Sequence, residues 1–243
     1  MKTDFSKNAT TDEIKARFDV DVERFSNLET GQQTTVDAPL LMDLCTEAAA
    51  CTNPGARELL DIGCGAGNYT LKMLTRVPGL NCTLNDLSLP MLKRAEERIA
   101  QQTTGSITLM QDDMRNLALP DAFFDIVLAA TTLHHLRDDA DWEQLFTKIY
   151  KALKPGGSFW ISDFIAHDSE VINRMFRDKF KNHLVTLGGT EYAEKQMTCV
   201  DYEDTPRSVN FQLALLQKVG FKDVEILHKH ASFAVFGGVK VLE

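Results

Sequence analysis

The segment from Leu59 to Gly67, Leu-Leu-Asp-Ile-Gly-Cys-Gly-Ala-Gly, constrains the fold of this chain more than any other part of its sequence. A short apolar run that ends in closely spaced glycines is typical of a strand that turns tightly into a helix. Glycine lets a ligand approach the backbone closely, and the free N–H groups of the following helix point at that ligand. The segment therefore predicts a strand–loop–helix unit with a ligand site at the loop.

Short apolar runs alternate with amphipathic segments from residue 58 onward. Strands are expected at 58–62, 81–86, 107–110, 124–130, 158–162, 223–227 and 233–237. Helices are expected at 69–74, after Ser88 with Met91, Leu92, Ala95 and Ile99 inward, and at 142–153 and 211–219. This alternation predicts an α/β fold, a doubly wound, mostly parallel sheet with helices on both faces.

Two helical regions flank or interrupt this pattern. Thr10 and Glu13 form a capping box, and a second helix is expected to start near Asp37. Apolar residues at helical spacing predict an amphipathic helix over about 168–184. This helix could be a lid over the sheet edge, a dimer contact or an ordinary helix packed on the core. We divide one domain into an N-terminal helical cap (1–54), a ligand-binding sheet core (55–163), a helical insertion (164–208), and the last helix with two strands (209–243).

Composition excludes several classes of protein. The 243 residues are 44% hydrophobic and 25% charged, with a net charge of −9, which argues against disorder and against coating nucleic acid. No apolar run is long enough to span a membrane, and Met1–Lys7 does not resemble a signal peptide. The odd count of 5 cysteines, without a CxxC pair, predicts reduced thiols and a cytoplasmic protein.

Acidic residues at the strand ends indicate the kind of ligand. Asp61 stands two residues before the first glycine, where it would repel a pyrophosphate but attract an ammonium or sulfonium group. Asp86 at the next strand end can accept from both ribose hydroxyls, and Asp112 or Asp113 from an adenine amino group. The alternatives are that Asp86 starts a helix and that Asp112 or Asp113 caps a turn.

In these residues the chain resembles the class I S-adenosylmethionine-dependent methyltransferases. The resemblance covers about residues 55–163 and is carried by a few segments. These are Asp61–Gly67, Asn85–Ser88, Asp113-Met114, Leu119–Val127, Leu133–Leu136 and Leu153–Gly157, with Gln217–Phe221 beyond them. It implies a Rossmann-like methyltransferase fold with a seven-stranded sheet whose last strand is antiparallel, S-adenosyl-L-methionine as cofactor, and S-adenosyl-L-homocysteine as product.

The resemblance also implies roles for individual residues. Asp61, Gly63 and Gly65 would surround the methionine moiety, Asp86 would bind the ribose, and Asp113 with the Met114 amide would bind adenine. The carbonyl of Ala129 would accept from the ammonium group, and Gly67 and Leu87 complete the predicted cofactor-binding set.

Methyl transfer needs in-line placement of a nucleophile, and a base only where the acceptor must lose a proton. His134 and His135, just past the fourth expected strand, are the candidate bases; the alternative is a hydrogen bond to the strand exit. Asp163 and His167 are further candidates. No metal-ligand spacing is evident, so we predict no metal. Arg174, Arg177, Lys179 and Lys181 could bind an anion or RNA, or form a solvated helix face.

The flanking segments resemble the group that contains carboxy-S-adenosylmethionine synthase, which serves modification of the tRNA wobble uridine. That group holds the extra carboxylate with an arginine, and this chain has Gln196 at about that position. Five apolar residues of the flanks are candidates for lining an acceptor pocket, or ordinary core residues: Phe18, Phe25, Met175, Phe176 and Phe180.

Three functions therefore stand. The first is a methyltransferase that acts on a small molecule, and the second is a carboxy-S-adenosylmethionine synthase-like enzyme. The third is a non-catalytic S-adenosylmethionine-binding interaction protein that uses the helical insertion to meet a partner. A nicotinamide dehydrogenase fits less well, because Asn68 replaces the third glycine of the dinucleotide pattern. We expect a homodimer through the insertion, no membrane association and no direct contact with nucleic acid.

Overall fold

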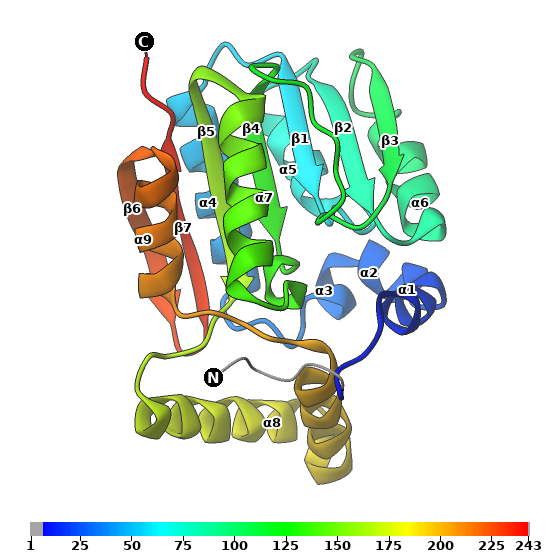
Figure 1. The fold of residues 1–243 in the computed structure, drawn as a ribbon. Helices are drawn as coiled ribbons and strands as arrows, with labels where there is room; N and C mark the ends of the chain where they lie inside the picture. The colour runs from blue at the N-terminus through cyan, green and yellow to red at the C-terminus, as the bar shows by residue number, and fades with distance from the viewer. Residues whose placement is uncertain (1–6, 243) are drawn as a thin grey trace.

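The computed structural model describes residues 7–242, apart from the side chains of residues 29 and 30 (Figure 1). The expectation about a signal peptide concerns residues that lie almost entirely outside this range. The chain forms a seven-stranded sheet in the order β3-β2-β1-β4-β5-β7-β6. The strands are β1 (Glu58–Ile62), β2 (Asn81–Asp86), β3 (Ile107–Gln111), β4 (Phe124–Ala130), β5 (Leu153–Phe164), β6 (Lys222–His230) and β7 (Phe233–Val239).

The first five strands are parallel to one another, and β7 is antiparallel to both of its neighbours. This arrangement confirms the predicted doubly wound sheet with an antiparallel last strand. The parallel strands end at the same edge of the sheet. The loops that follow β2 and β4 therefore lie on the same side of the molecule (Figure 1). Ligands in open α/β sheets bind at this carboxyl edge.

Helices cover both faces of the sheet. One face packs against α4 (Ala38–Thr52), α5 (Asn68–Arg76) and α6 (Leu89–Ile99), and the other against α7 (Asp139–Ala152) and α9 (Val209–Val219). The Ser88 side chain accepts from Met91 N, and the four predicted inward residues of α6 are buried, as expected. The two faces therefore form two separate apolar clusters, one on each side of the sheet.

The remaining helices lie along the carboxyl edge of the sheet. They are α1 (Thr11–Asp19), α2 (Val22–Ser26), α3 (Leu28–Gly31) and α8 (Glu170–Glu203), with the 3₁₀ helix η1 (Leu133–His135) after β4. In Figure 1 they lie below the sheet, with α8 crossing beneath it. The capping box predicted at Thr10 and Glu13 is present at the start of α1.

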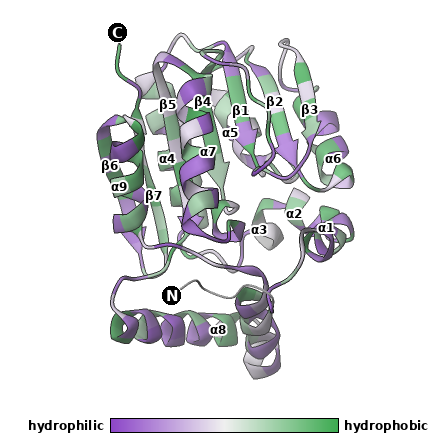
Figure 2. Cartoon of the chain, in the orientation of Figure 1, coloured by the Kyte–Doolittle hydropathy of each residue, from purple (hydrophilic) through white to green (hydrophobic). Residues whose placement is uncertain are grey.

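Helix α8 is longer than the predicted helix at 168–184. It continues to Glu203 through a kink at Gly189, whose φ of 82° and ψ of 180° suit glycine alone. Arg177 and Lys181, before the kink, form ion pairs with Asp201 and Glu194 beyond it. The two segments therefore lie against each other, and two of the basic residues suspected of binding an anion are paired within α8. Figure 2 shows hydrophilic and hydrophobic bands alternating along this helix.

Strand β5 begins earlier than predicted, and α7 correspondingly ends at Ala152. The Pro155-Gly156-Gly157 segment was expected to lie between the helix and the strand. Instead an irregular register between Phe124 and Ile126 of β4 and their partners accommodates it within the sheet.

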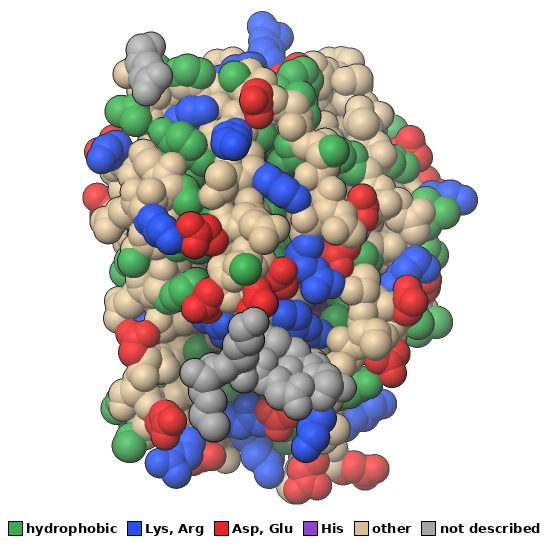
Figure 3. Space-filling view, viewed as in Figure 1, with side chains coloured by type: hydrophobic (Ala, Val, Ile, Leu, Met, Phe, Trp, Pro, Cys, Tyr) green, Lys and Arg blue, Asp and Glu red, His purple; other side chains and the backbone are tan. Residues whose placement is uncertain are grey.

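Within residues 7–242, no helix is both long and apolar enough to cross a membrane. All 5 cysteines are free, and three of them are buried. On the face drawn in Figure 3, positive and negative side chains are interspersed. That face therefore offers no extended basic surface of the kind that nucleic-acid binding requires.

Candidate active site

A cavity of about 550 Å³ lies between the carboxyl edge of the sheet and the helices beneath it. Its upper wall is made by the loops after β1, β2, β3 and β4. Its lower wall comes from α1 and α2, the loop before α4, and α8. Helices from both flanks thus cover the ligand edge of the sheet core.

The three glycines of the loop after β1 have different tasks. A Cβ atom on Gly63 would lie 2.1 Å from Thr132 Oγ1, so this glycine allows β1 and the β4 loop to approach. A Cβ on Gly67 would lie 2.9 Å from Ile99 Cδ1, so this glycine lets α6 pack closely. Gly65 has a φ of 51° and faces open space in the cavity. Gly63 and Gly65 line the cavity, whereas Gly67 does not.

Asp61 is buried at the end of β1 and borders the cavity. The Thr70 hydroxyl donates a 2.6 Å hydrogen bond to its Oδ2 atom. Burial raises the pKa of Asp61 to about 7, and the nearby Asp86 carboxylate adds to the rise. A cationic ligand beside Asp61 would restore its charge, so the site suits an ammonium or sulfonium group.

Asp86 joins the two loops that precede α5 and α6. Its two carboxylate oxygens accept from the backbone N–H groups of Gly65 (2.8 Å) and Ser88 (2.9 Å). Burial raises its pKa to about 6, against the opposing effect of these hydrogen bonds. Asp86 and Leu87 both line the cavity.

Asp113 also lines the cavity, but Arg115 already engages its carboxylate. The backbone N–H and Nε of Arg115 each lie 2.9 Å from Oδ1, and Thr11 Oγ1 donates to Oδ2 at 3.3 Å. Although burial opposes ionisation, these bonds hold the pKa of Asp113 below its usual range. Because Oδ2 also accepts from Arg115 Nη2 at 2.5 Å, an adenine amino group would have to displace one of these donors. Met114 lies in the cavity wall beside it.

Ala129 is paired on both sides within the sheet, with Ile62 of β1 and Ile161 of β5. Its methyl group is buried in the apolar cluster beneath α7 and α9. The next residue, Ala130, lines the cavity in its place.

The two candidate bases differ in their environments. His134 Nδ1 lies 2.6 Å from Asp163 Oδ1, and its backbone N–H donates to Asp163 Oδ2. Burial opposes a charge on His134, but Asp163 and Asp204 outweigh it and raise the pKa to about 9. Burial and the neighbouring His134 hold the pKa of His135 well below its usual value. At neutral pH His134 is therefore charged and His135 is neutral.

Three of the five apolar residues predicted to line an acceptor pocket do lie in the cavity wall: Phe18, Phe25 and Phe180. The Phe18 ring lies 5.4 Å from Phe25 and 6.1 Å from His135. The other two lie outside the cavity. Met175 is 41% exposed, and Phe176 stacks on His167 at 4.3 Å.

The sequence did not single out several residues that complete the cavity. Tyr192, Lys195 and Cys199 come from α8 beyond its kink, together with Gln196, and Arg17 comes from α1. Arg17 Nη2 pairs with Glu203 Oε2 at 2.5 Å and so joins α1 to the end of α8. The continuation of α8 past the kink, which the sequence pattern did not indicate, places its four side chains at the site.

Two groups among residues 7–242 have the composition of metal ligands. His134, His135 and Asp204 lie in the cavity, and Asp37, His228 and His230 lie at the far edge of the sheet. In each group the ligand atoms are within 4.8 Å of one another. Residues that are distant in sequence meet in both groups, which is why spacing alone indicated no metal.

Known proteins share this domain. Residues 59–157 match the family model described as a methyltransferase domain. A demethylmenaquinone methyltransferase of Lactiplantibacillus plantarum is 29% identical over 69% of this chain and 71% of its own length. A carboxy-S-adenosyl-L-methionine synthase of Mannheimia succiniciproducens is 29% identical over 75% of this chain and 76% of its own.

Solved structures share the fold at low identity. The [4+2]-cyclase SpnF superposes with a TM-score of 0.65 at 15% identity, covering 97% of this chain and 98% of that one. The YcgJ protein of Bacillus subtilis superposes with a TM-score of 0.61 at 16% identity, covering 84% of this chain and 100% of that one. The domain, the relatives and the fold identify this protein as a class I S-adenosylmethionine-dependent methyltransferase. Its cofactor is accordingly S-adenosyl-L-methionine, as predicted.

Proposed function

We propose that this enzyme transfers the methyl group to a small molecule enclosed between the sheet edge and the helices beneath it. The observation that carries the proposal is the cavity itself. One wall holds the glycine loop with Asp61 and Asp86, and the other holds Phe18, Phe25 and Phe180. Its volume of about 550 Å³ is within the range of small-molecule sites.

The cofactor would lie along the glycine loop. Gly65 leaves room for it, and Asp61 would face its ammonium or sulfonium charge. Asp86 would exchange part of its bonding to the loop for the ribose hydroxyls, and the Met114 amide would meet adenine. Because Ala130 lines the cavity and Ala129 does not, the backbone after β4 would approach the methionine moiety one residue later than expected.

His135 is the better candidate for a general base. A base must be unprotonated at the working pH, and the environment of His135 keeps it neutral while that of His134 keeps it charged. A base of low pKa serves best where the acceptor proton is acidic, as in a phenol. His134, held by Asp163, would instead position η1 and contribute positive charge to the cavity.

The test is an assay of S-adenosylhomocysteine release across small phenols, thiols, amines and carboxylic acids, with bulk tRNA as a further acceptor. We expect turnover with at least one small acceptor and none with tRNA. His135→Gln should lower kcat by about 100-fold or more without changing cofactor affinity. Asp121→Asn, on the surface away from the cavity, is the control. Turnover with tRNA alone would contradict the proposal.

A carboxy-S-adenosylmethionine synthase-like activity is the second candidate. It is favoured by the synthase relative, which aligns over three quarters of this chain, and by Lys195 beside Gln196 in the cavity. An ammonium group there could pair with an added carboxylate. Mass spectrometry of ligand released from the purified protein separates the two, because a carboxylated cofactor is heavier by one carbon dioxide unit. Binding of an adenosyl sulfonium without turnover of any acceptor would favour the non-catalytic alternative.

A cytoplasmic location and a homodimer through α8 are further parts of the proposal. The five free cysteines suit a reducing compartment. Val171, Ile172 and Met175, at the start of α8, are apolar and 40–66% exposed, which suits a contact with a second copy. Light scattering on the purified protein tests the dimer, and Val171→Lys should convert it to a monomer.

A further inference from the structure

Asp37 has an unusual backbone conformation for its position. It immediately precedes α4 and has a φ of 59°, in the left-handed region that few residues other than glycine adopt. An aspartate there usually caps the helix with its side chain, but the Asp37 carboxylate makes no capping hydrogen bond. The Asp37 carboxylate is therefore free of its own helix, and the strained backbone directs it toward another segment of the chain.

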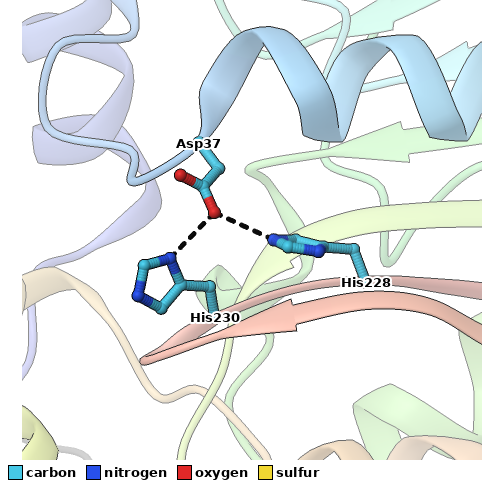
Figure 4. A group of neighbouring side chains, drawn as sticks. All are labelled: Asp37, His228 and His230. Carbon is cyan, nitrogen blue, oxygen red and sulfur yellow. Dashed lines mark hydrogen bonds and ion pairs between the residues drawn. The ribbon is translucent and has the colours of Figure 1, made fainter.

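The groups that face Asp37 are two histidines of the edge strand β6. His228 and His230 are two positions apart, so their side chains project from the same face of the strand. His228 Nε2 lies 2.9 Å, and His230 Nδ1 2.8 Å, from one oxygen of Asp37, Oδ2. Figure 4 shows both rings directed at that oxygen from different sides.

We propose that Asp37, His228 and His230 form a binding site for one divalent first-row transition-metal ion, with Zn²⁺ as the probe. Their ligand atoms all lie within 4.8 Å of one another. Ligands bound at about 2.0–2.2 Å in a tetrahedral zinc site lie about 3.3–3.6 Å apart, so small ring movements would admit an ion. Two imidazoles and one carboxylate are a common donor set for sites that keep open positions.

The charges around the cluster are compatible with a cation. Hydrogen bonds from His230 and His228 lower the pKa of Asp37, so its carboxylate is ionised at neutral pH. Lys229 lies between the two histidines in sequence, but its side chain points to the opposite face. There its Nζ lies 3.3 Å from His167 Nε2 and 5.2 Å from the centre of the Phe176 ring.

The cluster connects the sheet edge to the wall of the cavity. Gln32, Thr34 and Thr35 line the cavity, and Asp37 follows Thr35 by two positions. A bound ion would tie this loop and the start of α4 to β6, two segments that are far apart in the chain. Because such an ion binds the folded state, it would stabilise the protein against unfolding.

The experiment uses the full-length protein without a histidine tag, stripped of metal by a chelator and titrated with Zn²⁺ in a calorimeter. We expect one ion per chain, and about a 10-fold or greater loss of affinity in Asp37→Asn and His228→Gln. Zn²⁺ at about 100 times Kd should raise the Tm of the wild type by about 5–10 °C, and much less in the variants. His183→Gln, a histidine of α8 outside both clusters, is the matched control and should bind as the wild type does.

Three outcomes would overturn the proposal. They are no binding by the wild type up to millimolar Zn²⁺, unchanged binding in both variants, and loss of binding in His135→Gln but not in His228→Gln. The last would place the ion in the cavity cluster. Asparagine tolerates the left-handed backbone of position 37, and His228→Gln tests the site independently of that strain.

Discussion

Asp86 serves the glycine loop and the predicted ribose site with the same carboxylate. In Asp86→Asn one of the two acceptor oxygens becomes a donor, so a hydrogen bond to the Gly65 or Ser88 amide, or to the ribose, is lost. We expect S-adenosylmethionine binding to weaken by about 1–3 kcal/mol, or roughly 5- to 150-fold, in a calorimetric titration. Asp121→Asn, an exposed acid that does not line the cavity, controls for net charge. Equal affinities in the two variants would argue against the ribose role.

His134 should make stability depend on pH in the alkaline range. The pKa of His134 in the folded protein, about 9, is above the ordinary value near 6.5. Its contribution to the free energy of unfolding is therefore complete below about pH 6.5 and is lost as the pH rises through 9. Asp61 and Asp86, with raised pKa values of about 7 and 6, titrate mainly below pH 8, and they do so in both the wild type and a His134 variant, so their effect cancels in the comparison.

The measurement is the free energy of unfolding of wild type and His134→Gln from pH 7 to pH 9.5. The wild type should lose on the order of 3 kcal/mol more than the variant across this range. Ionisation of buried thiols such as Cys45 affects both proteins alike near the upper limit and cancels in the difference. Parallel pH profiles would show that the Asp163–His134 pair does not hold a proton.

At the level of secondary-structure elements, two glycines of the loop after β1 have different roles. Gly65 faces the ligand cavity, and Gly67 allows α6 to pack closely. Gly65→Ala places a methyl group in the open cavity, and Gly67→Ala drives one into Ile99 and Ala95 of α6. Both variants carry backbone strain of about 1 kcal/mol, and Gly67→Ala adds about 1–3 kcal/mol for overpacking. We expect Gly65→Ala to lose mainly cofactor affinity and Gly67→Ala mainly stability, measured by titration and urea denaturation. The opposite assignment would contradict these roles.

The kink in α8 rests on one glycine. Gly189 has a backbone conformation that other residues rarely adopt, yet nothing lies within 4 Å of an added Cβ. Gly189→Ala should therefore cost about 1–3 kcal/mol through backbone strain alone. Gly55→Ala, where the space is also open and φ is not positive, is the control and should stay within about 0.5 kcal/mol. An unchanged urea midpoint for Gly189→Ala would mean that the kink relaxes freely.

Elements with strong local signals were predictable. The capping box at Thr10, the inward face of α6 and all seven strands follow from residue patterns that the tertiary structure leaves intact. The path of α8 did not follow from such a pattern. Gly188 and Gly189 are typical of the end of a helix. The helix nevertheless continues beyond them, and the Arg177–Asp201 ion pair holds the segments on the two sides of the kink together.

For the molecule as a whole, closure of the cavity depends on contacts between α1 and the C-terminal end of α8. Besides Arg17–Glu203, Tyr202 donates to Glu13 at 3.0 Å, and the Ala9 amide donates to the Tyr202 carbonyl. We expect S-adenosylhomocysteine to slow amide hydrogen exchange in α1 and the second half of α8, but not in β6. Arg17→Met should remove much of this protection. Uniform protection across the chain would indicate global stabilisation without closure.

The class of this protein could be predicted from its residues alone, because glycines and acids at the ends of alternating strands encode the cofactor edge locally. The same residues also indicated that Asp61, Asp86 and Asp113 would meet at that edge, since parallel strands end together. The tertiary structure alone decided which histidine is charged, which aromatic residues face the cavity, and that Asp37 meets His228 and His230. Each of these depends on contacts between segments that are distant in the chain, and periodicity and spacing carry no information about such contacts.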